Sequence, residues 1–175
     1  MDAAHFVHRA YLGVIWCFTR IFIASPSGRK RFNVLGAVNA ITKEVITVTN
    51  QTYINSESIC QVLLKLSALN LDVPITVVLD NVRNQKCRVV TVLAEVLNIE
   101  LLYLSSYSPH LNLIERLWQF VRKQCLYSKY YDNFDDFKTA IETCIEQANT
   151  IHKEALKTLL SLNFQCFKKA QISTV

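Results

Sequence analysis

Residues 75–81 have the sequence Ile-Thr-Val-Val-Leu-Asp-Asn, an unbroken aliphatic and β-branched run that ends in two polar residues. Such a run is typical of a strand that is buried on both faces of a sheet. Apolar residues at helical spacing follow at about 85–97, and a second short apolar run follows at 100–104. The order strand, helix, strand predicts a parallel β-α-β unit.

Strands and helices are also predicted on both sides of this unit. Apolar and β-branched residues predict a strand or a buried run at 14–24 and strands at 31–40 and 44–49, and the last two form an antiparallel hairpin. Helical spacing predicts helices at 56–69, 111–125 and 133–149, and a helical segment from about 153. Asn55 is in position to cap the first helix. The whole pattern predicts the α/β class, with a mixed sheet flanked by helices.

Composition restricts the class of protein but not its activity. The chain has 175 residues, which predicts one domain, and 51% of them are hydrophobic. The net charge of +5 mildly favours a polyanionic partner such as nucleic acid. The most apolar stretch, 11–24, is too short to span a membrane and contains Arg20. The six cysteines form no C-x-x-C pair, which indicates free thiols in a reducing cytosol.

Two acidic residues occupy positions from which they can face the same edge of the predicted sheet. Asp80 directly follows the buried run, and reactive groups of α/β sheets collect beyond the carboxyl ends of strands. Glu115 lies at the flank of an apolar helical stripe. Taken alone, Asp80 is more often a turn cap, and Glu115 is more often a solvated surface residue. The residues themselves leave both interpretations open.

The sequence around Glu115 resembles a known family. Tyr-Ser-Pro-His-Leu-Asn-Leu-Ile-Glu-Arg-Leu-Trp at 107–118 resembles the third-acid block of DDE transposases, in the bacterial insertion-sequence group related to the mariner superfamily. Val-Leu-Asp-Asn at 78–81 matches the strand of the second acid, and 34 residues separate Asp80 from Glu115, as in that group. Segments 27–36 and 49–53 are also similar, so the resemblance covers about 2–150. It implies a ribonuclease H-like fold.

The same resemblance implies a catalytic, metal-binding triad of Asp2, Asp80 and Glu115. Asp2, in Asp-Ala-Ala-His-Phe-Val, matches the first acid, although by itself it would be a frayed terminal residue. The triad implies DNA cleavage and strand transfer with two Mg²⁺ or Mn²⁺ ions, which Asp80 would bridge, with Asp2 on one side and Glu115 on the other. Because the sequence begins next to Asp2, we expect a truncated first strand and a mobile Asp2. The implied domains are a catalytic domain at 1–150 and a C-terminal helical tail at 151–175.

DNA contacts are expected from basic and polar residues near these elements. The candidates are Arg29, Lys30, Arg31, Asn112, Arg116, Arg122 and Lys123. A solvated hairpin tip is an equal alternative for 29–31. Asn112 could contact the metal site or DNA, and helix capping is an equal alternative for it. Trp118 is expected to be a core anchor, and His5 and His8 to have structural or DNA-facing roles. The family further implies a homodimer, or a partner subunit that carries a helix-turn-helix. It also implies a location in the bacterial cytoplasm, at the nucleoid, and no membrane partner.

Three functions remain open at this point. The first is a transposase catalytic domain. The second is a non-catalytic transposase remnant that binds DNA or a partner subunit, which the expected loss of the first strand favours. The third is a ribonuclease H-like nuclease or junction resolvase, against which the block at 107–118 argues, since a fold alone does not set a function.

Overall fold

The computed structural model describes residues 1–9, 11, 18–19, 28–69, 71–80, 83–105 and 111–164. The strand predicted at 14–24 lies almost entirely outside the described residues, and so does the Tyr-Ser-Pro-His part of the block at 107–118. The strands and helices of the described ranges form a mixed α/β fold, which confirms the predicted class.

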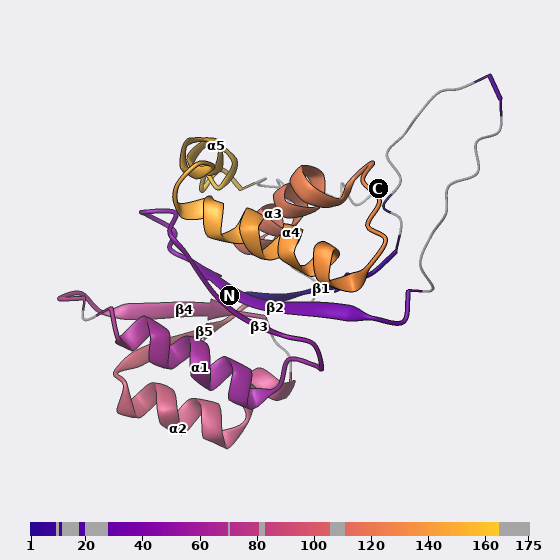
Figure 1. Cartoon of the computed structure of the whole chain (residues 1–175). Coiled ribbons are helices and arrows are strands. Elements are labelled where there is room, and N and C mark those ends of the chain that lie inside the picture. Colours follow the sequence, from indigo (N-terminus) through magenta and orange to yellow (C-terminus); the bar gives the residue numbers. More distant parts are fainter. Residues whose placement is uncertain are drawn as a thin grey trace, which may run out of the picture.

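A three-stranded antiparallel sheet forms the centre of this fold (Figure 1). β1 (Asp2–Val7) pairs with β2 (Arg31–Val38), and β2 pairs on its other edge with β3 (Val45–Asn50). The β2–β3 hairpin confirms the predicted one. Asp2 is the first residue of β1 and lies opposite Gly36 of β2, at the end of the ladder. The expected mobility of Asp2 stays a prediction.

A parallel pair of strands forms a second sheet. β4 (Ile75–Leu79) and β5 (Ile99–Tyr103) are parallel, and η1 (Arg83–Lys86) and α2 (Arg88–Val96) lie between them in the chain, as the predicted β-α-β unit requires. The prediction that β4 is buried on both faces is wrong for one face. Val77 and Leu79 are buried, whereas Thr76 is exposed. Alternate side chains point to opposite faces of a strand, and the face of Thr76 is left open by the described residues.

α1 (Ser56–Ser67) and α2 cover one side of the sheets, in the lower half of Figure 1. The side-chain oxygen of Asn55 accepts a hydrogen bond from the backbone nitrogen of Ser58 at 3.0 Å, which confirms the predicted cap. α1 and α2 bury an apolar face against Leu35 of β2 and Leu79 of β4. These buried side chains form a lower apolar cluster, which connects the two sheets.

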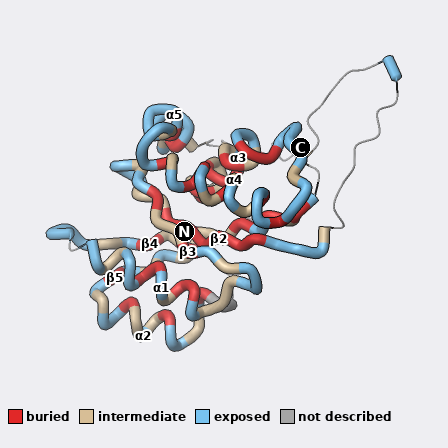
Figure 2. The backbone as a smooth tube through the Cα atoms, in the orientation of Figure 1, coloured by how far each residue is buried: buried red, intermediate tan, exposed pale blue. Residues whose placement is uncertain are grey.

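Three further helices cover the other side. These are α3 (Leu113–Val121), α4 (Phe134–Glu146) and α5 (Lys153–Leu159), with a π-helical turn η3 (Arg122–Leu126) after α3 and a short η4 (Gln147–Asn149) after α4. Figure 2 shows buried segments on both sides of the central sheet. The division at residue 150 stays a prediction, although Leu156 and Leu160 lie in the same cluster as α3 and α4. In the described part of the chain, no helix is long and apolar enough to cross a membrane.

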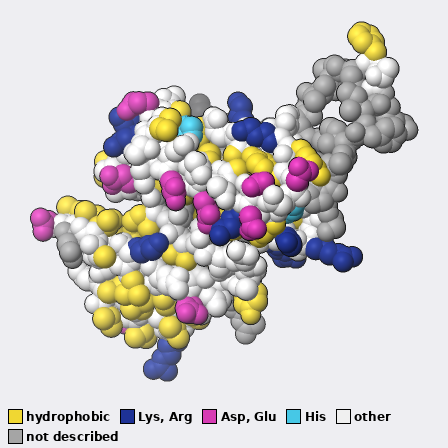
Figure 3. Space-filling view, in the orientation of Figure 1, with side chains coloured by type: hydrophobic (Ala, Val, Ile, Leu, Met, Phe, Trp, Pro, Cys, Tyr) yellow, Lys and Arg dark blue, Asp and Glu magenta, His cyan; other side chains and the backbone are white. Residues whose placement is uncertain are grey.

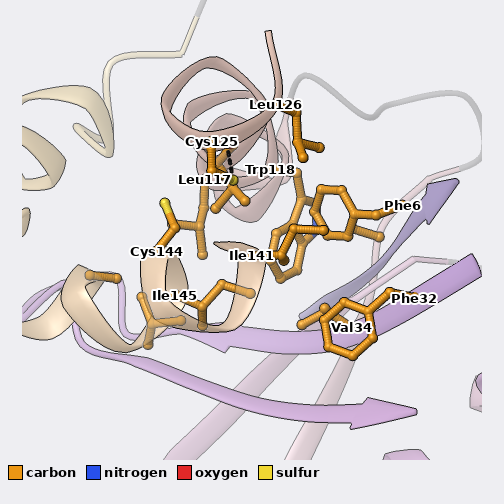
Figure 4. Close-up of a cluster of buried hydrophobic side chains, with 14 of the residues drawn as sticks. Phe6, Phe32, Val34, Leu117, Trp118, Cys125, Leu126, Ile141, Cys144 and Ile145 are labelled. Carbon is orange, nitrogen blue, oxygen red and sulfur yellow. Dashed lines mark hydrogen bonds between the residues drawn. The ribbon is translucent and has the colours of Figure 1, made fainter. Parts of the chain in front are cut away.

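Buried apolar side chains of β1, β2 and the three helices α3, α4 and α5 form an upper cluster, and Trp118 of α3 is at its centre. Its side chain is 1% exposed, and its ring lies edge-on to Phe6 of β1, with centroids 6.3 Å apart. Figure 4 shows it beside Phe6 and Ile141 of α4. The predicted role of Trp118 as a core anchor is confirmed, and helix, strand and neighbouring helix are joined through one side chain.

Gly36 permits this packing. A Cβ atom at this position would lie 2.8 Å from Cη2 of Trp118 and 2.9 Å from Cδ1 of Ile114. Real Cβ atoms do not approach other atoms so closely, so α3 reaches β2 only because Gly36 has no side chain. Since Gly36 is the direct partner of Asp2, this contact also sets how far α3 lies from Asp2.

We predict that Gly36→Ala destabilises the chain by about 1–3 kcal/mol, the usual cost of overpacking a dense core. The new methyl group displaces Trp118 and Ile114, so the tryptophan fluorescence of the folded state also changes. Urea denaturation followed by fluorescence measures both effects.

Gly28→Ala is the matched control. Gly28 has φ +69° but only an ordinary 3.6 Å contact with Val7, so its substitution costs about 1–2 kcal/mol through the left-handed backbone alone. The fluorescence of Trp118 stays unchanged in this variant. A Gly36→Ala chain with unaltered stability and fluorescence would show that α3 does not depend on the missing side chain.

Candidate active site

The three predicted acids come from three different elements. Asp2 opens β1, Asp80 directly follows β4, and Glu115 lies in the first turn of α3. The nitrogen of Met1 donates a hydrogen bond to the carbonyl oxygen of Val78 at 2.7 Å. This bond holds the start of β1 against the carboxyl end of β4, so Asp2 and Asp80 lie at the same edge.

Alternation along β1 places the carboxylate of Asp2 on the side of α3. Ala4 and Phe6 belong to the upper cluster with Trp118, and Asp2 shares their face of the strand because side chains alternate. Glu115 follows Ile114 on the helix that packs there. The sheet and helix thus bring Asp2 and Glu115 toward each other.

The charges of the three acids influence one another. The pKa of Asp2 is raised to about 6, mainly by burial and to a smaller extent by the negative charges of Glu115 and Asp80, while a backbone hydrogen bond and the Met1 ammonium group act in the opposite direction. Such interactions require short distances. The three carboxylates therefore lie at one partly buried edge of the sheet, near enough for the charges of Glu115 and Asp80 to act on Asp2.

Met1 is part of the surroundings of this site. Its side chain is buried, and burial lowers the pKa of its ammonium group to about 6, although the charges of Asp2 and Asp80 act in the opposite direction. The positive charge of Met1 beside these acids offsets part of their mutual repulsion, but burial of the ammonium group disfavours its charged form.

The surroundings of Asn112 separate its three expected roles, which were contact with the metal site, contact with DNA and helix capping. It stands at the N-cap position of α3, yet its side chain makes no capping hydrogen bond. It is 5% exposed, and its Nδ2 donates to Oδ1 of Asp80 at 3.2 Å. Because a buried amide needs a partner, this bond fixes both side chains. Asn112 is thus a positioning residue for Asp80, and its predicted DNA contact stays untested.

The donor set of the site suits hard divalent cations. Carboxylate oxygens are the ligands that Mg²⁺ and Mn²⁺ prefer, and Mg²⁺ commonly uses one or two carboxylates together with waters and substrate phosphates. Within the described ranges, no group of three or more acidic, imidazole or thiol side chains is close enough to hold a metal ion. A metal role for Asp2, Asp80 and Glu115 therefore stays a prediction.

Arg29, Lys30 and Arg31 are exposed at the far end of the β1–β2 ladder. The register places Arg31 opposite Val7, five residues from the Asp2–Gly36 pair. At about 3.4 Å per residue this is roughly 17 Å. Any DNA contact of this cluster therefore lies well away from the acids.

The other predicted DNA contacts differ in their surroundings. The guanidinium of Arg116 donates to the carbonyl oxygens of Leu159, Ser161 and Asn163 at 3.3, 2.7 and 3.1 Å. These bonds tie the segment after α5 to α3 and favour a structural role. Arg122 lies over the ring of Phe6, and Lys123 is exposed. The DNA contacts of all three stay predictions.

The two histidines near Asp2 are engaged within the fold. Nε2 of His8 lies 3.0 Å from the carbonyl oxygen of Tyr131, and its buried ring packs on Phe137. Nδ1 of His5 lies 2.7 Å from Oδ1 of Asn33. These contacts favour the structural roles expected for both.

Comparison with known proteins agrees with this geometry. Residues 19–138 match the family model described as DDE superfamily endonuclease. The matched segment contains Asp80 and Glu115, while Asp2 precedes it. A comparison with curated proteins found no match.

Solved transposase structures share the fold. The Mos1 transposase paired-end complex with left transposon end has 14% identity and a TM-score of 0.61, over 94% of this chain and 55% of that chain. The Mos1 mariner paired-end complex with Mn has 14% identity and a TM-score of 0.58, over 95% of this chain and 55% of that chain. The catalytic domain of Mos1 mariner transposase has 16% identity and a TM-score of 0.51, over 91% of this chain and 86% of that chain.

The likeness covers about half the length of the transposase chains in the two complexes but most of the isolated catalytic domain. The fold is therefore the ribonuclease H-like mixed α/β fold of transposase catalytic domains, as predicted.

We predict that Asn112→Ala weakens Mn²⁺ binding by about 10- to 100-fold, as is usual when the hydrogen bond that orients a metal ligand is lost. Removing the hydrogen-bond partner of the half-buried carboxylate of Asp80 also costs about 1 kcal/mol of stability. Calorimetric titration with Mn²⁺ and urea denaturation measure the two effects.

Asn133→Ala is the control for that variant. Asn133 caps α4 through the backbone nitrogen of Asp136 at 2.8 Å, and its loss costs about 1 kcal/mol without any change in Mn²⁺ affinity. Equal Mn²⁺ affinities of the two variants would exclude a positioning role for Asn112.

We also predict that metal binding at Asp2 depends on pH. The pKa of Asp2 is raised to about 6 in the folded chain, so the folded state holds this proton more tightly than the unfolded state. The contribution of Asp2 to stability therefore falls as pH rises from about 4 to about 6. A metal binds the charged form, so the increase in Tm that Mn²⁺ causes grows as pH rises through about 6.

Thermal unfolding at about pH 5 and about pH 7.5, with and without Mn²⁺, tests this pH dependence around the raised pKa. Asp2→Asn keeps the Met1 ammonium group but removes the carboxylate, so the part of the pH dependence that belongs to Asp2 disappears in this variant. The same Mn²⁺-induced increase in Tm at both pH values in the unaltered chain would contradict the prediction.

Proposed function

The chain belongs to the DDE superfamily endonucleases, and on this premise we propose that it is the catalytic part of a transposase that cleaves DNA at the ends of a mobile element and transfers the cut strand. The observation that supports the proposal is the convergence of Asp2, Asp80 and Glu115 from β1, β4 and α3. The family match spans two of these acids.

The acids alone would repel a DNA phosphate, so the proposed reaction requires divalent cations. Two Mg²⁺ or Mn²⁺ ions, held by Asp2, Asp80 and Glu115, would activate water or a 3′-hydroxyl and stabilise the leaving oxygen. One of the similar structures is a Mos1 paired-end complex with Mn, and we extend a dependence on divalent metal to the present chain as part of the proposal.

The chain's own residues contribute position and charge. Asn112 holds the carboxylate of Asp80 in one orientation, and the packing of α3 on Gly36 holds Glu115 near the sheet. Partial burial of Asp2 keeps bulk water away from part of the site, which strengthens its electrostatic interactions. Orientation of this kind is what phosphoryl transfer demands, since positioning and charge stabilisation account for most of the catalysis.

DNA is the proposed substrate, and the proposed assembly is a homodimer or a complex with a helix-turn-helix subunit. One of the similar structures is a complex with a transposon end, and the net charge of +5 favours a polyanion. A cytoplasmic location at the nucleoid completes the proposal. Among the described residues, Cys60, Cys87, Cys125 and Cys144 are free, as expected in a reducing compartment.

We predict metal-dependent nicking of supercoiled DNA that carries the sequences flanking the gene. Asp80→Asn and Glu115→Gln each reduce the rate by about 100-fold or more, because loss of a metal ligand removes several kcal/mol of transition-state stabilisation. Gel assays with Mg²⁺, with Mn²⁺ and with a chelator measure the nicked product.

Glu95→Gln is the matched control, since Glu95 is an exposed carboxylate on α2. It retains the full rate. Undiminished metal-dependent nicking by both acid variants would refute the proposed site. Cleavage of an RNA–DNA hybrid in preference to DNA would keep the site but replace the proposed reaction.

A further inference from the structure

The outer face of α2 is apolar, and no part of the chain that the structure describes covers it. Val89, Val92 and Val96 are 64%, 46% and 75% exposed. The inner face of the same helix is buried, with Val90 and Ala94 in the lower apolar cluster. Figure 3 shows apolar side chains gathered over α2 and the adjoining part of α1, in the lower left of the view. A helix that lies on a sheet normally presents polar residues to water, so this face requires an explanation.

Valine is an unfavourable residue for an exposed helical position. Its branched side chain loses rotamer freedom in a helix, whereas lysine or glutamate would favour the helix more and would also be well hydrated. The three exposed valines therefore contribute little to the folding of α2 itself. Contiguous exposed apolar side chains commonly mark a contact with another macromolecule.

The three valines form one narrow stripe along the helix. Successive residues are turned by about 100° around a helix axis, so Val89 and Val96 lie about 60° and about 40° from Val92, in the same direction. Val89 stands three residues before Val92, and Val96 stands four residues after it. The stripe therefore extends about equally far to both sides of Val92.

Two opposite charges accompany the stripe on its other flank. Arg88 and Glu95 are exposed, and they lie about 40° and about 60° from Val92, in the direction away from the other two valines. Within the described ranges, neither side chain takes part in an ion pair. Arg88 stands four residues before Val92, and Glu95 stands three residues after it. A positive and a negative charge thus lie at similar distances from the middle of the stripe.

This arrangement is complementary to itself. When two α2 helices pack antiparallel about a two-fold axis at Val92, equal flanks face each other and the helix ends are exchanged. Val89 of each copy then meets Val96 of the other. On the second flank, Arg88 of each copy meets Glu95 of the other, whereas parallel helices would bring like charges together. A second copy of the chain therefore matches both the apolar and the charged part of this face.

We propose that the outer face of α2 binds a second copy of this chain, which packs its own α2 antiparallel across Val92. This surface is inferred from α2 alone, so it stands whether or not the chain cleaves DNA. In Figure 1, α2 lies on the side of the sheets away from α3, so a copy that is docked there does not cover Glu115.

The association is weak and reversible. α2 has nine residues and is about 14 Å long, so two such faces bury less than the roughly 1,200 Å² of a lasting dimer. The contact becomes effective where another interaction already holds two copies together, because linked partners reach effective concentrations of about 1 mM or more.

Sedimentation equilibrium of the full chain at about 0.02–1 mM tests this surface, since a weak interface has a dissociation constant in the micromolar to millimolar range. The unaltered chain is expected to shift from monomer toward dimer across this range. Val92→Lys places two like charges at the two-fold axis and is expected to weaken the association by about tenfold or more. The variant stays folded, because Val92 is half exposed and lysine favours a helix.

Ile41→Lys is the matched control. Ile41 is 87% exposed in the turn between β2 and β3, so this variant gains the same charge away from α2 and keeps the association of the unaltered chain. Nicking assays at submicromolar chain concentration fall far below the range of association. Glu95→Gln therefore remains without effect on nicking, and a failure of the proposed catalysis is distinguishable from a failure of this surface.

Charge reversal tests the antiparallel pairing. Arg88→Glu and Glu95→Arg each bring like charges together, and each is expected to weaken the association by about tenfold. The double variant restores both opposite pairs with their signs exchanged, so it recovers most of the lost affinity.

Three results would overturn the proposal. In the first, the unaltered chain stays monomeric at every concentration. In the second, Val92→Lys associates as strongly as Ile41→Lys, which would place the contact elsewhere on the chain. In the third, the double charge reversal associates as weakly as the two single reversals, which would exclude the antiparallel pairing.

Discussion

The contact between α3 and Gly36 of β2 is the constraint on which the rest of the structure depends. Ile114 and Trp118 occupy the space where a side chain at this position would be. Glu115 is the neighbour of Ile114 on the helix, and Asp2 is the partner of Gly36 in the sheet. Dense packing thus fixes an acid on a helix relative to an acid on a strand, and a close-packed core transmits such positions with little slack.

Much of the fold could be predicted from the sequence because local patterns determine local structure. The alternation of β2, the helical spacing of α1 and its cap at Asn55 are properties of single elements. The bond from Asn112 to Asp80 and the three bonds of Arg116 join residues that are 32 to 47 positions apart. Periodicity shows which face of an element is buried but not which residue lies opposite, so the partners in these bonds could not be predicted, although contact with the metal site was one of the roles expected for Asn112.

The candidate site was predictable to unequal degrees. Asp80 and Glu115 stand in distinctive local sequences, whereas Asp2 depended on a resemblance over a few residues. Its placement follows from long-range pairing, because Gly36 and Val78 hold the start of β1 from two sides. The burial that raises the pKa of Asp2 has the same origin. Like charges held together in this way cost stability, which is common where function demands an arrangement that the fold alone would not favour.

The three acids also differ in how firmly the fold holds them. Asp80 accepts a hydrogen bond from a buried amide, and Glu115 belongs to a helix that is anchored by Trp118. Asp2 stands at the end of the β1–β2 ladder, next to the hydrogen bond from Met1 to Val78. Strand ends fray more readily than strand centres, and metal ligands must hold their geometry to within about 0.5 Å. The bond from Met1 to Val78 therefore matters most for Asp2, because it holds the strand end that carries this acid.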